Sequence, residues 1–200
     1  MSELQNLLVL LEDQWRRHEL PIGERLRPGL SEDEVRTRLA AVEVSPSREY
    51  VEWFGWHDGA STESMMTPVH RIETLDRCIE QYATHVIPGG LDEETNAGWF
   101  PIATSISGAV VVTDCTGSSS DLAVTTVVTR EGERYSPEYY LPSLVVPVRW
   151  WVNRFTTGAW TRREDFPEAV RNLLDDLDEE ALEEALSVFP WTARQQGFIC

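Results

Sequence analysis

The chain of 200 residues contains no lysine, so its 17 lysine-plus-arginine residues are all arginine. This absence excludes the phosphate-binding loop that ends in Gly-Lys-Ser/Thr, because the lysine of that loop reaches the phosphates. Gly117-Ser118-Ser119-Ser120 therefore predicts only a flexible hairpin connection. Cysteine is also scarce, and Cys78, Cys115 and Cys200 lack the paired spacing of zinc or redox sites. We therefore expect a reducing, cytoplasmic environment and neither a metal ion nor another cofactor.

Long apolar runs are missing as well. No run approaches the roughly 20 apolar residues that span a membrane. The run 7–11 follows Glu3 rather than a basic residue, and no small-residue cleavage site comes after it, so we expect no signal peptide. The apolar residues of this segment instead recur at helical spacing and predict one face of a helix that packs on the body: Leu4, Leu7, Leu8, Leu11 and Trp15.

Acidic residues are in excess. The chain has 34 Asp and Glu residues and a formal net charge of −17, so we expect it to repel nucleic acid and we expect no membrane partner. Two interpretations of the acidity stay open at this point. The carboxylates can keep the protein soluble, or they can attract a basic partner.

The order of predicted elements is helices, then strands, then helices. Ser31 and Glu34 form a capping box at the start of one helix, and further helices are predicted over Glu73–His85, Ser143–Gly158 and the acidic Glu164–Val188. The segment 67–72 is predicted to be extended, and β-branched residues predict a meander of three strands at Trp99–Ala103, Ala109–Cys115 and Leu122–Thr129. Because helices and strands segregate along the chain, we expect an α+β fold.

The segment 46–59 predicts a short amphipathic helix with a fixed stop. Pro46 cannot continue an earlier helix, Ser47 can cap the first turn, and Gly59 can adopt the left-handed conformation that reverses the chain. Its apolar stripe is formed by Tyr50, Trp53, Phe54 and His57. This stripe alone indicates a packed helix.

Catalytic motifs were not found. His57 and Asp58 are adjacent, so their side chains point in different directions, and no Ser or Cys stands in a nucleophile motif. The acidic run 92–94 lacks the ligand spacing of a calcium loop. We therefore predict no catalytic residue, no metal site and no enzymatic activity. A small hydrolase using His57, Asp58 or Asp114 remains the third alternative, and it requires at least two of them to converge in a pocket.

A series of short motifs then follows in a characteristic order: the capped helix from Ser31, Pro46 to Tyr50, Trp56-His57-Asp58-Gly59, Thr74 to Ile79, Trp99-Phe100-Pro101-Ile102-Ala103, Val110 to Asp114, Ser143-Leu144, Trp151 and Gly158. This order resembles the SUKH superfamily, the domain of the yeast cell-wall assembly regulator and of many bacterial immunity proteins. The resemblance covers about residues 24–163. It gives Pro46, Tyr50 and the residues Trp56, His57, Asp58 and Gly59 a structural role.

The resemblance implies a single domain over 1–200 in which helices partly wrap a twisted antiparallel sheet. The first helix and residues 164–200, a C-terminal helical extension, lie outside the matched core. The implied function is that of an immunity protein, a binding module that neutralises a basic toxin such as a nuclease. An intracellular scaffold or regulatory adaptor is the second alternative. The expected partner-binding residues are Asp92, Glu93, Glu94, Trp99, Asp114 and Asp121, with the tryptophan as an anchor on or near the exposed sheet surface.

Overall fold

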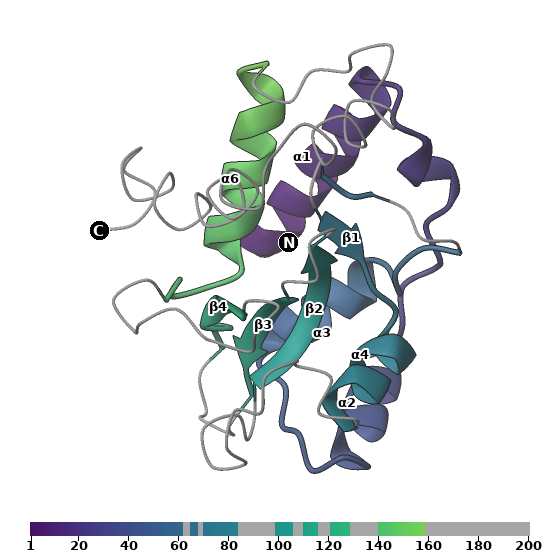
Figure 1. Ribbon diagram of the computed structural model, residues 1–200, viewed down its shortest axis with the longest axis vertical. Helices are drawn as coiled ribbons and strands as arrows, with labels where there is room; N and C mark the ends of the chain where they lie inside the picture. Colours follow the sequence, from purple (N-terminus) through teal and green to yellow (C-terminus); the bar gives the residue numbers. More distant parts are fainter. Residues whose placement is uncertain are drawn as a thin grey trace, which may run out of the picture.

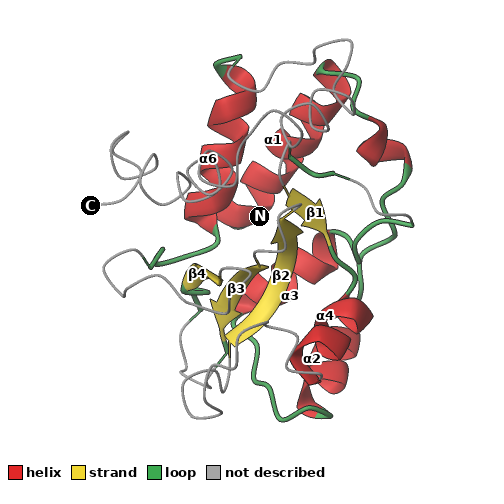
Figure 2. Ribbon diagram, viewed as in Figure 1, coloured by secondary structure: helices red, strands yellow, loops and turns green. Residues whose placement is uncertain are grey.

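The computed structural model describes residues 1–61, 65–67, 70–83, 99–105, 110–115, 121–128 and 140–158, and these form an α+β fold. Figure 1 and Figure 2 show the arrangement of the described helices and strands. The helices are α1 (Glu3–Arg17), the 3-10 helix η1 (Pro21–Glu24), α2 (Glu32–Ala40), α3 (Arg48–Trp56), α4 (Leu75–Ala83) and α6 (Val145–Thr156). Three parts of the sequence prediction lie outside the described residues: the acidic run 92–94, the hairpin connection 117–120 and the helix over 164–188.

The described strands form one antiparallel sheet. They are β1 (His70–Ile72), β2 (Trp99–Ser105), β3 (Val110–Asp114) and β4 (Thr125–Val128), and they pair in chain order. The predicted meander is therefore confirmed, although its last strand begins three residues later than the pattern indicated. Residues 121–124 precede β4 as irregular backbone.

Side chains on the two faces of the sheet belong to different apolar clusters. Side chains of successive strand residues point to opposite faces, and accordingly Phe100 packs in the main core whereas Trp99 belongs to a smaller cluster with Val110 and Val112. A bulge between Pro101 and Ala103 interrupts this alternation. The main core therefore lies on the face of the sheet to which Phe100 points.

Helix α3 covers the core face of the sheet. Tyr50 meets Phe100 edge-on at 5.6 Å between ring centroids, and its hydroxyl donates to the carbonyl of Pro101 at 3.2 Å. Tyr50, Trp53 and Phe54 are fully buried, as their helical spacing predicted. Burial raises the pKa of Tyr50 well above its usual value, so the phenol stays neutral and keeps donating this hydrogen bond.

Helices α1 and α6 lie side by side at one end of the sheet (Figure 1). Leu4, Leu8, Leu11 and Trp15 are buried along α1, and Leu7 packs against them half-buried, so the predicted packing face is confirmed. The indole of Trp15 donates to the carbonyl of Met66 at 2.8 Å, which ties α1 to the segment before β1. In the described part of the chain no helix is both long enough and apolar enough to cross a membrane.

The helix caps agree with the sequence prediction, whereas several boundaries do not. The hydroxyls of Ser31 and Ser47 accept from the backbone N–H groups of Glu34 and Tyr50, as predicted. The helical spacing of Val35, Leu39 and Val42 predicts that all three belong to one helix, but α2 ends at Ala40, so Val42 lies in the following turn. Glu43 has a φ of +59°, and the backbone N–H of Val44 donates back to the carbonyl of Leu39 at 3.0 Å, so this turn stops the helix.

Candidate functional site

The N-terminal turn of α3 carries three charged side chains that point in two directions. Arg48 and Glu52 are four residues apart and share one face of the helix, where their ion pair measures 3.4 Å. Glu49 points toward the start of α6 and is only 3% exposed. Ser47 caps the helix, so this turn is fixed in place. No motif of the sequence pointed to any of these three charged residues.

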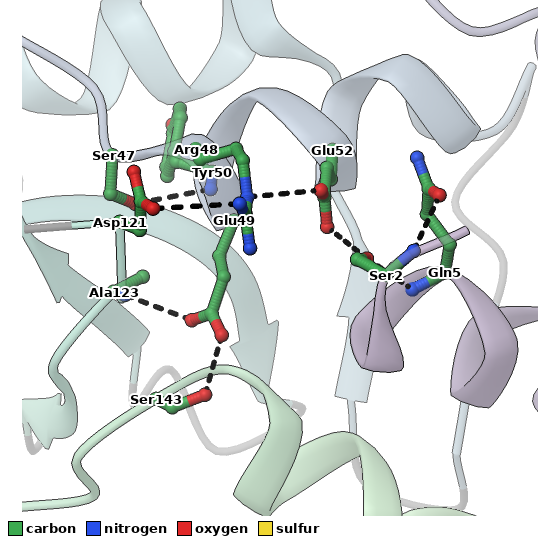
Figure 3. A network of polar contacts seen from close by, with 10 residues as sticks. All are labelled: Ser2, Gln5, Ser47, Arg48, Glu49, Tyr50, Glu52, Asp121, Ala123 and Ser143. Atoms are coloured by element: carbon green, nitrogen blue, oxygen red, sulfur yellow. Dashed lines mark hydrogen bonds and ion pairs between the residues drawn. The ribbon is translucent and has the colours of Figure 1, made fainter.

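Glu49 joins three parts of the chain through its carboxylate. Its Oε2 accepts from the backbone N–H of Ala123 at 2.9 Å, and its Oε1 accepts from the hydroxyl of Ser143 at 2.6 Å (Figure 3). Oε2 also accepts from the backbone N–H of Leu144 at 2.9 Å. The backbone N–H of Glu49 also donates to the carbonyl of Asp121 at 3.2 Å. The carboxylate therefore holds the segment before β4 and the start of α6 against α3.

Glu52 has a different environment on the same helix. Its Oε2 accepts from the hydroxyl of Ser2, the residue that caps α1, at 2.5 Å (Figure 3). Its Oε1 is met by Nε of Arg48 at 3.4 Å, and the Nη1 of Arg48 is also 3.4 Å from Oδ2 of Asp121. The guanidinium of Arg48 thus lies between two carboxylates in two loose ion pairs.

A depression of about 330 Å³ opens beside these groups, where the N-terminal ends of α1, α3 and α6 meet the segment before β4. We call it the junction pocket. Its apolar lining consists of Leu4, Leu122, Pro142, Val145 and Val146. Its charged lining consists of three carboxylates and one guanidinium, from Glu3, Glu49, Glu52 and Arg48. Leu122, which lines the pocket, is 47% exposed.

The predicted partner-binding residues fall into separate places. Asp121 lies beside the junction pocket with its side chain 70% exposed. Trp99 and Asp114 are opposite each other in the pairing of β2 with β3. Asp92, Glu93 and Glu94 lie outside the described residues. The structure therefore leaves the partner role of all these acids a prediction.

Trp99 differs from the expectation of an exposed anchor. It is only 7% exposed, because its ring packs edge-on against Tyr140 at 5.2 Å and clusters with Val110, Val112 and Val124. The sequence pattern could not predict that Trp99 is buried, because Tyr140 comes from a distant part of the chain. In this arrangement Leu122, rather than Trp99, is the exposed apolar side chain next to an acidic residue.

The predicted structural motif closes the end of α3. Helix α3 ends at Trp56, and Gly59 has a φ of +67°, the left-handed conformation that the sequence predicted. A Cβ at Gly59 would lie 2.6 Å from the backbone nitrogen of Thr74, so this position also requires the absence of a side chain. Pro46 lies two residues before the helix starts, as expected of a residue that cannot continue an earlier helix.

His57 and Asp58 hold different neighbours. Nδ1 of His57 donates to the carbonyl of Arg27 at 2.8 Å, and Nε2 lies 3.2 Å from the Glu12 carboxylate. Glu12 also accepts from the indole of Trp56. Asp58 is buried, accepts from the backbone N–H of Leu75 at 2.8 Å and pairs with Arg27 at 3.3 Å. The side chains of His57 and Asp58 therefore connect different segments and do not hydrogen-bond to each other.

The described residues include two buried cysteines, Cys78 and Cys115. Burial raises the pKa of the Cys115 thiol to about 12 and that of Cys78 well above its usual value, so both thiols remain protonated at neutral pH. Among the described residues no group of three or more His, Cys, Asp and Glu side chains is arranged to hold a metal ion. The predictions of no cofactor and no enzymatic activity stay predictions.

The geometry is that of a small, mostly apolar pocket with carboxylates around it and an exposed leucine at its edge. In comparison with known proteins, no family model and no curated protein matches the chain.

Proposed function

We propose that the chain is a non-enzymatic protein-binding module of the SUKH type, an immunity protein that binds and neutralises a basic bacterial toxin such as a nuclease. The α+β fold with its four-stranded antiparallel meander agrees with the SUKH arrangement that the motif order implies. We also propose that it acts in the cytoplasm, which agrees with the unpaired thiols of Cys78 and Cys115.

The observation that carries the proposal is the acidic surface around an exposed apolar side chain. Leu122 lies next to Asp121 at a pocket that Glu3 and Glu52 also line. Protein interfaces combine an apolar centre with a polar rim. A nuclease has to be basic in order to hold phosphates, so a net charge of −17 would accelerate its capture by electrostatic steering.

A protection assay tests this function. The gene of an immunity protein is expected beside that of a large toxin, so the C-terminal domain of the neighbouring toxin is expressed in a bacterial host with and without this chain. We expect growth to be arrested by the toxin domain alone and restored by co-expression. Unrestored growth, with both proteins present in soluble form, would contradict the proposal.

The charge dependence of association tests the steering. The triple variant Asp92→Ser, Glu93→Ser and Glu94→Ser should slow association with the toxin domain, most visibly at low salt, because the Debye length falls from about 10 Å at 0.1 M to about 3 Å at 1 M. The rate is measured by stopped-flow fluorescence. A rate that depends neither on salt nor on these substitutions would assign the acidity to solubility alone.

A further inference from the structure

The junction pocket offers two kinds of contact to one occupant. Leu4, Leu122 and Val146 form an apolar wall, and Glu52 is a carboxylate at the same pocket. A volume of about 330 Å³ is at the low end of the roughly 300–1,000 Å³ typical of ligand sites, so it fits a single side chain better than a large ligand. Such a combination matches a side chain with a methylene stem and a cationic end.

A cationic side chain of the chain itself already lies at these carboxylates. The guanidinium of Arg48 lies between Glu52 and Asp121, at 3.4 Å from each. Charge-assisted N–H···O bonds of good geometry measure about 2.7–2.9 Å, so Arg48 is held loosely. Its side chain is more than half exposed, so its guanidinium can move into solvent, and an arriving cation would then pair with the Glu52 carboxylate, which is 12% exposed.

We propose that the junction pocket binds an arginine side chain of the protein partner, whose guanidinium replaces that of Arg48 at Glu52 and whose methylene groups lie against Leu4, Leu122 and Val146. Arginine fits better than lysine because its planar guanidinium can donate to two oxygens at once, whereas lysine carries a point charge. Arginine is also a frequent anchor of protein interfaces. This inference deepens the proposed function and rests on it for the identity of the partner.

The test uses the full-length protein and two small probes. One probe is a blocked tripeptide, glycine-arginine-glycine, and the other carries citrulline in place of arginine, which keeps the shape and removes the charge. Binding is followed by NMR from the methyl signals of Leu4, Leu122 and Val146. We expect saturable shifts of these signals with the arginine peptide and an affinity about tenfold lower for the citrulline peptide.

Two matched pairs of variants separate the pocket from general electrostatics. Glu52→Gln keeps an acceptor for the Ser2 hydroxyl and should reduce arginine binding to the level of citrulline, whereas Glu32→Gln, which breaks the exposed ion pair with Arg36, should not. Arg48→Gln removes the internal competitor and should tighten arginine binding severalfold. Arg36→Gln removes the same charge elsewhere and should change it much less.

The outcomes are distinct. Equal binding of the arginine and citrulline peptides, shifts scattered outside the pocket, or equal effects of Arg48→Gln and Arg36→Gln would each overturn the inference. The peptide assay contains no toxin, so it separates the two proposals. Arginine binding without protection of the host would refute the immunity function and leave the pocket assignment standing, and protection without arginine binding would do the reverse.

Discussion

Glu49 should be the polar residue whose loss destabilises this fold most. In Glu49→Ala, the backbone N–H groups of Ala123 and Leu144 and the hydroxyl of Ser143 lose their acceptor in a buried place. A buried donor without a partner costs about 1–3 kcal/mol. Part of this is offset because the folded state no longer has to desolvate a carboxylate. We therefore expect the free energy of unfolding to fall by about 3–5 kcal/mol.

Glu49→Gln tests the same reasoning with less damage. Its amide oxygen can accept from both backbone N–H groups, and its NH₂ group can donate to the Ser143 hydroxyl, so we expect a loss of about 1–2 kcal/mol. Urea unfolding followed by tryptophan fluorescence gives both values, and hydrogen exchange at Ala123 and Leu144 reports the local opening. The exposed Glu32→Gln serves as the control and should stay within about 0.5 kcal/mol of wild type. An alanine variant that loses less than about 1 kcal/mol would refute the role of Glu49 as a junction.

Three further changes test other parts of the structure. Gly59→Val should lower the free energy of unfolding by more than about 2 kcal/mol, since its Cβ would collide with the backbone of Glu73 and Thr74, and an unchanged melting temperature would mean that this turn differs. His57→Ala should cost about 1–3 kcal/mol through the lost bond to Arg27 and leave partner affinity per folded molecule unchanged, so a well-folded variant that no longer binds would contradict the structural role. Burial lowers the pKa of His70 from 6.5 to about 4, so the unfolded chain binds a proton there that the folded chain does not. The free energy of unfolding should therefore be independent of His70 above pH 6.5 and should fall by about 3 kcal/mol as the pH drops to 4. In His70→Gln, the free energy of unfolding measured by denaturation should change less with pH.

Local patterns predicted much of the fold, because they describe interactions between near neighbours. The capping serines, the apolar stripe of α3 and the left-handed Gly59 all depend on residues within a few positions of one another. The paired strands followed from β-branched runs separated by turn residues. The boundaries were less accurate, as the end of α2 at Ala40 shows.

The junction pocket could not be predicted in this way, because its contacts join distant parts of the chain. The donors to Glu49 lie 74 to 95 residues further along the sequence. One signal was available: Glu49 is four residues before Trp53 and therefore lies on the buried side of a helix. A carboxylate in that position indicates fixed donors, although the sequence does not say which residues supply them.

Glu49 and Glu52 are three residues apart on one helix, and their surroundings differ. Those of Glu49 suit a role in stability, and those of Glu52 suit a role in binding. The oxygens of Glu49 are occupied by three donors and the residue is 3% exposed, so a partner's cation cannot reach it without breaking the junction. The side chain of Glu52 is 12% exposed and faces a cation that can leave. A ligand that binds only the folded state raises its stability. The arginine peptide should therefore raise the melting temperature of wild type and of Glu49→Gln but not that of Glu52→Gln, and the opposite result would exchange the roles of the two carboxylates.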